Sequence, residues 1–353
     1  MRRYLILAPG EFAENAKTAQ GVIRYSSDET VAVVDPTLAG KSVREVAPHL
    51  SSDAPIVASV ADGLRFNPTA LLIGTAPQGG RLPPAWRAEV LAAIAAGLEI
   101  VSGLHDMLGA DAAFAAAARA AGTTIWDVRE PPETPLFSGA AYAVKPPVLL
   151  LVGNDCAVGK MTVAIELCAA AKERGTDATF VPTGQTGIMI AGWGIAVDRV
   201  IGDFGTGAAE QLVVHAAKSE PDLIVVEGQG AINHPAYAPV TLSLMYGCAP
   251  DALLLVCEVP HATIPAFGTP VLDYGHLIAI HEALLATVKP ARVVGIALNT
   301  RTIADDADAC KEIARAHEET GLPADDVVRF GSKHLYDALP AIAKRQPLSE
   351  ARS

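Results

Sequence analysis

The sequence has few aromatic residues and no long uninterrupted apolar run. Phe, Trp and Tyr supply 5% of the 353 residues, although 50% of all residues are hydrophobic. No apolar run reaches the roughly 18 residues that a membrane-spanning helix needs. The opening segment MRRYLILAPGEF has two arginines, but its apolar stretch is too short for a signal peptide. We therefore expect a cytoplasmic protein without a membrane partner, in which many alanines let helices pack closely on sheets.

Paired cysteines and an excess of positive charge are also missing. The five cysteines are scattered and no CxxC occurs, so the sequence predicts neither a metal site nor a disulfide framework. A formal net charge of −12 argues against a nucleic-acid partner. It does not exclude phosphate-bearing small molecules, because a single loop can hold those.

The first 130 residues alternate strand-like and helix-like segments. Strands are predicted at 4–9, 30–35, 55–60, 70–75, 99–103 and 123–128, and helices at 83–98 and 110–122. Strands separated by helices favour right-handed βαβ units, and hence an α/β Rossmann-like domain with a parallel sheet. No G-x-G-x-x-G follows the first strand, so a dinucleotide site has no support. The proline-rich segment 129–147 is the expected linker, which gives a Rossmann-like domain over 1–145 and a P-loop NTPase-like domain over 146–353.

The second domain opens with VLLLVGNDCAVGKMTVAIELCAAAKERG, residues 148–175. An apolar strand ends at Gly153, a short loop follows, and a helix begins near Lys160. Backbone N–H groups, the helix N-terminus and the lysine together form a cradle for phosphate. The residues predicted to hold a phosphate-bearing cofactor are Gly153, Asn154, Asp155, Cys156, Ala157, Val158, Gly159, Lys160, Met161 and Thr162.

This loop departs from the pattern G-x-x-x-x-G-K-[ST] in two ways. Five residues separate its glycines, and Met161 follows the lysine, with a hydroxyl only at Thr162. The hydroxyl after the lysine normally holds Mg²⁺, which a methionine cannot do. The loop therefore favours phosphate binding over ATP hydrolysis. Cys156 lies inside it, where positive potential should lower the pKa of the thiol.

Further polar motifs follow strands of the second domain. TGQTG, residues 183–187, ends a strand at 178–183, and Glu227 ends the apolar run LIVV before Gln229 and His234. Ligands of open α/β sheets bind at these strand ends. Further strands are predicted to end at 202–203 and to span 252–258, 292–300 and 327–331. Helices are predicted at 207–220, 273–287, 304–320 and 334–344.

Two resemblances add a function to these motifs. The loop spacing with Asp155 and the segment VEGQG resemble dethiobiotin synthetase and related amide-forming ligases. Over nearly the whole length, GNDCAVGKMT, PTGQTG, VEGQG and HPAY after a Rossmann-like half resemble a bacterial P-loop family catalogued as a domain of unknown function. The characterised member of that family is a D-glutamate N-acetyltransferase.

The second resemblance implies transfer of acetyl from acetyl-CoA to the amino group of an acidic amino acid, with D-glutamate as the acceptor. The loop would hold the CoA phosphates, and Lys160 or backbone N–H groups would stabilise the oxyanion. Glu227, Asp155 or His234 would take the ammonium proton. The residues expected to contact the substrate are Thr183, Gln185, Thr186, Gln229, Arg199 and Arg301, the arginines as partners for its carboxylates.

Two other functions remain open. An ATP- and Mg²⁺-dependent ligase or kinase would use Asp155, the loop spacing and Glu227, and would release phosphate when its substrate is present. A non-catalytic nucleotide sensor would bind a ligand and turn over nothing. Because related P-loop ligases are often dimers, we also expect a homo-oligomer.

Overall fold

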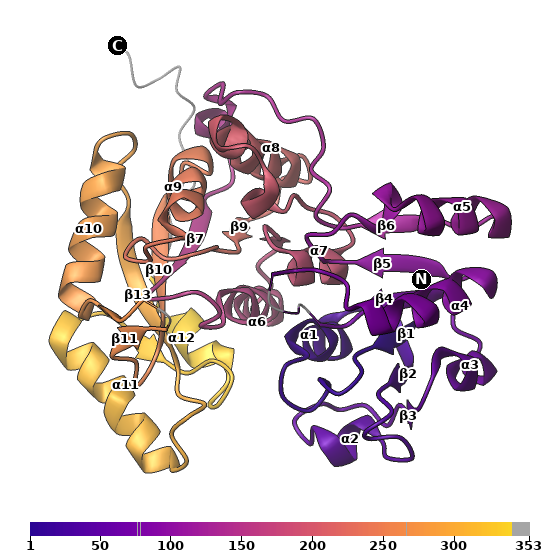
Figure 1. Cartoon of the computed structure of the whole chain (residues 1–353). Coiled ribbons are helices and arrows are strands. Elements are labelled where there is room, and N and C mark those ends of the chain that lie inside the picture. Colours follow the sequence, from indigo (N-terminus) through magenta and orange to yellow (C-terminus); the bar gives the residue numbers. More distant parts are fainter. Residues whose placement is uncertain (76, 78, 266, 341–353) are drawn as a thin grey trace. The chain divides into compact units, whose positions relative to one another are not determined.

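The computed structural model describes residues 1–75, 77, 79–265 and 267–340, and its chain divides into two compact units (Figure 1). The first unit contains residues 1–131 and 188–196, and the second contains residues 132–187 and the chain from 197 onward. The division thus falls near the start of the proline-rich segment. From Pro132 that segment belongs to the second unit, where the Glu210 carboxylate accepts N–H bonds from Ser138 at 2.7 Å and Ala141 at 3.1 Å.

The first unit is a six-stranded parallel sheet in the order β3-β2-β1-β4-β5-β6. This is the strand order of a doubly wound Rossmann-like domain and confirms the predicted fold. Its strands are β1 (Arg3–Leu7), β2 (Glu29–Val34), β3 (Ile56–Val57), β4 (Ala70–Ile73), β5 (Glu99–Ser102) and β6 (Ile125–Asp127). Its α-helices are α1 (Lys17–Tyr25), α2 (Val43–Val46), α3 (Val60–Gly63), α4 (Arg87–Ala95) and α5 (Ala112–Ala121).

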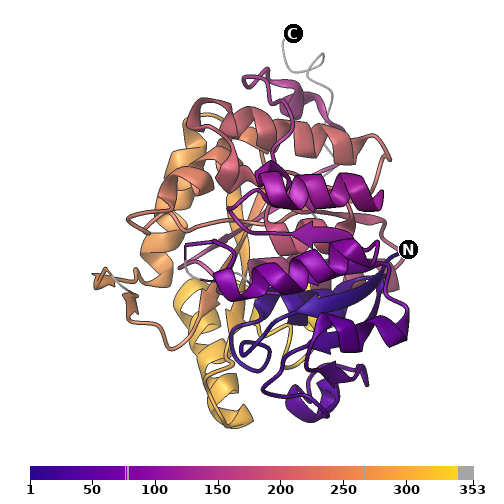
Figure 2. The same cartoon turned by 45° about the vertical axis from the view of Figure 1, so that its right-hand side comes forward.

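Both faces of this sheet are buried because its strands are apolar at successive positions. Tyr4 and Ile6 point into one core with residues of α1, whereas Leu5 and Leu7 point into another with residues of α4 and α5. Helices α4 and α5 pack side by side over that second face (Figure 2). Glu99 at the start of β5 pairs with Arg2 at 2.7 Å, at the edge of the sheet opposite to the strand ends where ligands bind.

The second unit is also a six-stranded parallel sheet, in the order β14-β13-β10-β7-β9-β8 (Figure 1). Its strands are β7 (Val148–Gly153), β8 (Ala178–Val181), β9 (Leu223–Val226), β10 (Ala252–Glu258), β13 (Arg292–Asn299) and β14 (Ala324–Asp325), with a small hairpin of β11 (Thr263–Ile264) and β12 (Thr269–Pro270). Its α-helices are α6 (Lys160–Glu173), α7 (Gln185–Ala191), α8 (Gly205–Ala217), α9 (Ala238–Gly247), α10 (Tyr274–Ala286), α11 (Asp306–Thr320) and α12 (Ser332–Ala338). Because β7 lies between β9 and β10, the loop after β7 opens where the strand order reverses.

Two predicted strands are wrong. Residues 197–204 form two short 3₁₀ turns, since the apolar pair 200–201 stands alone among charged residues and Ile201 is 73% exposed. Residues 327–330 form a turn because the Asp326 carboxylate accepts the N–H groups of Val328 and Arg329, both at 3.0 Å. The strand of this region is β14, just before the turn.

The helices show smaller differences from the predictions. The segment TGQTG is not an open loop, because α7 begins within it at Gln185. From Ile188 onward, the residues of α7 belong to the first unit. Helix α9 has no counterpart in the sequence predictions. The predicted last helix ends at Ala338, and the part of its range after residue 340 lies outside the described residues. No helix in the described part of the chain has both the length and the apolar composition needed to cross a membrane.

Candidate functional site

The loop between β7 and α6 presents a row of backbone N–H groups. Ala157 and Gly159 adopt positive φ values of 57° and 108°, which turn the chain sharply into the helix. Within the described residues, the N–H groups of residues 157–162 have no hydrogen-bond acceptor. The first turn of α6 also contains no acidic side chain that would neutralise the helix N-terminus. Such a row of N–H groups at a helix start binds anions.

Lys160 links this loop to the VEGQG segment. Its ammonium donates to the carbonyl oxygens of Asp155 and Gly230, both at 2.8 Å, and its side chain is 5% exposed. The aliphatic part passes so close to Gly228 that a Cβ there would lie 2.9 Å from Lys160 Cδ and 1.8 Å from the Leu151 oxygen. Gly228 therefore has to be glycine, chiefly because any side chain there would overlap the backbone of β7. Burial lowers the pKa of Lys160.

Glu227 lies directly after β9 and ties the TGQTG segment to the same site. One carboxylate oxygen accepts the N–H groups of Thr183 at 3.0 Å and Gly184 at 3.2 Å, and Gln229 Nε2 donates to Thr183 Oγ1 at 3.2 Å. The structure thus brings together Glu227, Thr183 and Gln229, three of the residues that the sequence analysis selected for the site. Burial raises the pKa of Glu227 to about 7, against the lowering effect of the two N–H bonds.

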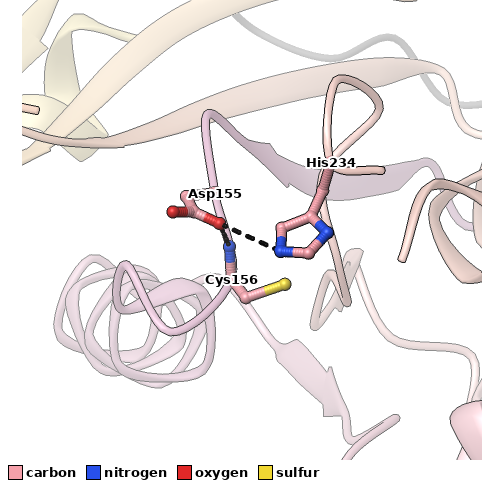
Figure 3. A group of neighbouring side chains, drawn as sticks. All are labelled: Asp155, Cys156 and His234. Carbon is pink, nitrogen blue, oxygen red and sulfur yellow. Dashed lines mark hydrogen bonds and ion pairs between the residues drawn. The ribbon is translucent and has the colours of Figure 1, made fainter. Parts of the chain in front are cut away.

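Asp155 is the most connected side chain of the loop. Its side chain is 7% exposed, and the carboxylate accepts the Cys156 N–H at 2.6 Å. His261 Nε2 lies 2.7 Å from one carboxylate oxygen, and His234 Nε2 lies 3.8 Å from the other. Figure 3 shows the Asp155 carboxylate facing the His234 ring, with the Cys156 side chain beside it. A single carboxylate is therefore shared by two imidazoles at the edge of the phosphate loop.

His234 is held as a donor rather than as a base. Its Nδ1 accepts the Ala236 backbone N–H at 3.1 Å, so the neutral ring carries its proton on Nε2. The ring packs against Tyr237 and Phe267, with centroid distances of 4.6 and 5.3 Å. With Nδ1 already occupied, the neutral ring has no free lone pair, and this geometry disfavours the role of base considered from sequence.

The same hydrogen bond bears on metal binding. Within the described residues, Asp155, Cys156 and His234 offer ligand atoms that lie within 4.8 Å of one another. A metal would need the Nε2 lone pair, but Nε2 carries the proton. Burial also raises the pKa of the Cys156 thiol to about 11 and outweighs the nearby lysine, so the lowered pKa expected from sequence is wrong. The donor set is a poor fit for a metal ion.

The other residues predicted for the site are spread around the loop. Asn154 bridges to the backbone of Glu258 through two bonds of 3.2 Å, and Arg301 pairs with the Glu258 carboxylate at 3.0 Å. Arg199 is exposed on a 3₁₀ turn. Gln185 and Thr186 start α7, and Met161 and Thr162 are half-buried in the first turn of α6. Asn299, at the end of β13, donates to the Val158 oxygen at 3.0 Å and so supports the loop.

His261 is the site residue that sequence reasoning passed over. It lies three residues after β10, the strand that pairs with β7. Since β10 and β7 are parallel, a polar residue just beyond the end of β10 reaches the same edge as the phosphate loop. The sequence could have pointed to His261 through this position, because the apolar run 252–257 marks the strand and shows where it ends.

Comparisons with known proteins agree with this two-part organisation. Residues 36–131 match a family model described as the Rossmann-like domain of DUF1611_N, and residues 135–336 match one described as a domain of unknown function, the DUF1611_C P-loop domain. A protein of Tritonibacter scottomollicae named D-glutamate N-acetyltransferase is 38% identical over 277 residues, which cover 77% of this chain and 81% of that protein. A protein of Pseudoalteromonas sp. with the same name is 35% identical over 285 residues, which cover 77% and 82%.

A solved structure has the same fold throughout. The crystal structure of a DUF1611 family protein from Anabaena variabilis has 38% sequence identity and a TM-score of 0.89, and the match covers 96% of this chain and 99% of that one. The match therefore includes both parallel sheets. On its sequence, its domain composition and its fold, the chain belongs to the DUF1611 family.

Proposed function

We propose that the protein transfers the acetyl group of acetyl-CoA to the amino group of an acidic amino acid, with D-glutamate as the acceptor. The observation that carries the proposal is the row of N–H groups at residues 157–162, which have no acceptor among the residues that the structure describes and which include those of Lys160 and Met161. Such a loop suits an anion that is held but not hydrolysed, because the position directly after the lysine, where a hydroxyl normally holds Mg²⁺, is Met161. The names of the two relatives supply the acetyl group and the acceptor.

The pyrophosphate and 3′-phosphate of CoA fit this loop chemically. Of the predicted residues 153–162, those from 157 to 162 would bind the phosphates through backbone N–H groups, because the N–H groups of Asn154 and Cys156 already have acceptors. Lys160 would add a charge-assisted bond. An ammonium has three N–H donors, and the carbonyl groups of Asp155 and Gly230 use two of them. The third N–H would thus be left for a CoA phosphate, on an ammonium that the fold already holds at the loop.

Transfer also requires a deprotonated amine and an anchor for the acceptor carboxylates. Glu227 and Asp155 are the carboxylates near the loop, and Thr183, Gln185, Thr186 and Gln229 provide hydrogen-bonding groups beside Glu227. Arg199 and Arg301 are exposed cations of the same unit that can meet a carboxylate. General base catalysis of this kind typically accounts for a 10²–10⁴-fold acceleration, roughly 3–5 kcal/mol.

The test combines binding with turnover. Calorimetry should show CoA binding without magnesium, and incubation with acetyl-CoA and D-glutamate should release free thiol, with L-glutamate and D-alanine testing the stereochemistry and the side-chain carboxylate. Tight binding of Mg-ATP with no response to CoA would contradict the proposal and favour the ligase or kinase. Binding of CoA without thiol release from any acidic amino acid would favour a sensor.

A further inference from the structure

The two histidines that share Asp155 are held in different ways. His261 Nε2 lies 2.7 Å from the carboxylate, which is hydrogen-bonding distance, whereas His234 Nε2 lies 3.8 Å away. A carboxylate can only accept, so the short contact requires the proton on His261 Nε2. In the neutral His261 ring, the lone pair is therefore on Nδ1. In the His234 ring that atom already accepts the Ala236 N–H.

From this difference we propose that His261, oriented by Asp155, is the general base that takes the proton of the acceptor amine; the inference rests on the proposed acetyl transfer. Within the described residues, His261 Nδ1 has no hydrogen-bond partner, and the side chain is 16% exposed. A carboxylate that fixes one ring nitrogen of an imidazole leaves the other as the base and stabilises the imidazolium that forms. Asp155 is a positioning residue in this arrangement.

The dyad lies beside the proposed cofactor loop because Asp155 belongs to it. The Asp155 side chain holds His261 while its backbone oxygen accepts from Lys160 Nζ at 2.8 Å. The proposed base, His261, and the proposed phosphate-binding cation, Lys160, are therefore both hydrogen-bonded to Asp155. Glu227 is less suited to the role, because it is 5% exposed and accepts two backbone N–H groups that shape the start of α7.

The reaction balances with His261 as the only protein group that changes protonation. The acceptor ammonium gives one proton to Nδ1, and the freed lone pair forms the C–N bond at the thioester carbonyl carbon. The C–S bond breaks, and its electron pair leaves on sulfur. The proton on His261 then passes to the thiolate, and the second proton lost by nitrogen goes to solvent. The products are the N-acetyl amino acid, free CoA and one proton.

The first experiment replaces His261 and compares catalysis with cofactor binding. We expect His261→Ala to lower kcat by 10²–10⁴-fold, as for loss of a general base, and to leave the Kd of CoA within about twofold. Added imidazole should restore part of the rate. Asp155→Asn should also lower kcat, because the asparagine amide is neutral and cannot stabilise the imidazolium as the carboxylate does. The matched control is His276→Ala, since His276 forms an equivalent 2.7 Å contact with Asp273 on the exposed start of α10 and should change neither quantity.

The outcomes separate this inference from the proposed function. A His261→Ala enzyme with kcat within threefold of the wild type, or one that loses CoA binding together with activity, would overturn the role of base. If the wild-type protein acetylates no acidic amino acid, the proposed function fails, and the dyad is still tested by imidazole ¹⁵N resonances assigned with the His261 variant. We expect His261 to be protonated on Nε2 in the neutral ring, and a neutral ring protonated on Nδ1 would overturn the inference.

Discussion

Each of the two units begins with a strand, a loop and a helix, but the backbone N–H groups of the two loops are bonded differently. In the first, β1 is followed by residues 8–16 and then α1; in the second, β7 is followed by residues 154–159 and then α6. In the first loop, several backbone N–H groups already have hydrogen-bond acceptors in the protein. Glu11 and Asn15 donate to carbonyl oxygens of that loop at 3.1 and 2.9 Å, and Phe12 donates to the Asp35 carboxylate at 3.3 Å. The second loop leaves the N–H groups of residues 157–162 without acceptors in the described part of the chain.

This difference indicates that the loop sequence determines whether backbone N–H groups are available to a ligand, whereas the topology determines only where the loop lies. Both loops lie where the strand order of a parallel sheet reverses, which is the general position of ligands in such sheets. In the first unit a fully buried Phe12 and the Asp35 carboxylate close the loop, and five of its N–H groups, those of Ala8, Glu11, Phe12, Glu14 and Asn15, are bonded to protein acceptors. In the second unit two glycines and a lysine keep the backbone donors available. Substitutions at corresponding positions of the two loops test this contrast.

The largest contrast is expected between the lysines that begin the two helices. Lys160→Ala should weaken CoA binding by about 10- to 100-fold, because a charge-assisted bond to phosphate is lost. Lys17→Ala at the start of α1 should leave CoA binding unchanged. Calorimetric titration of both variants measures the effect, and equal weakening by the two substitutions would contradict the assignment of the loop.

A second contrast concerns pH and the buried carboxyl at the end of β9. The pKa of Glu227 is raised from 4.5 to about 7, so the folded protein holds this proton more tightly than the unfolded chain. The contribution to stability is complete below pH 4.5 and is lost as the pH rises through 7, by an amount of about 3 kcal/mol at most. Glu227→Gln should remove that part of the decrease in the free energy of unfolding, measured by urea denaturation at pH 5 and pH 8. An unchanged difference between the two pH values would show that other groups cause it.

The third contrast compares Gly153, the last residue of β7, with Gly10 in the loop after β1. A Cβ at Gly153 would lie 2.9 Å from the Val256 oxygen and 3.1 Å from Lys160 Nζ, so Gly153→Ala should displace the lysine and weaken CoA binding about tenfold. Gly10 has φ of 72° and no atom within 4 Å of the Cβ position. Gly10→Ala should therefore cost only about 1–2 kcal/mol of stability from its backbone conformation, with normal CoA binding. Paired denaturation and binding measurements distinguish the two, and normal CoA binding by a folded Gly153→Ala protein would argue against this packing.

The smallest contrast concerns exposed arginines. Arg301 pairs with Glu258 near the phosphate loop, and Arg44 pairs with Asp53 in the first unit. If Arg301 meets an acceptor carboxylate, Arg301→Ala should raise the acceptor KM about two- to fivefold, since an exposed ion pair contributes up to about 1 kcal/mol. Arg44→Ala should not change KM. Steady-state kinetics with varied acceptor measures both, and a KM unaffected by Arg301→Ala would remove this arginine from the acceptor site.

Local pattern predicted much of this protein and failed where a side chain bonds to the backbone two or three residues away. The buried strands and the loop around Lys160 follow from apolar runs and glycine spacing, which are local properties. The short stretch 327–331 was apolar enough to suggest a strand, but the Asp326 carboxylate takes its N–H groups and forms a turn. From the sequence, His234 was a candidate base. In the structure, the backbone N–H of Ala236, two residues away, donates to its Nδ1 and so occupies the lone pair that a base would need.

The sequence by itself determined two parallel-sheet units and a glycine-containing loop between β7 and α6, because strand burial, helix starts and glycine turns depend on neighbouring residues. Only the tertiary structure decided which side chains meet at that loop. His261 reaches Asp155 across 106 positions of the chain, and Lys160 reaches Gly230 across 70. Such contacts depend on which strands lie side by side, and strand order results from the packing of the whole sheet rather than from any one segment.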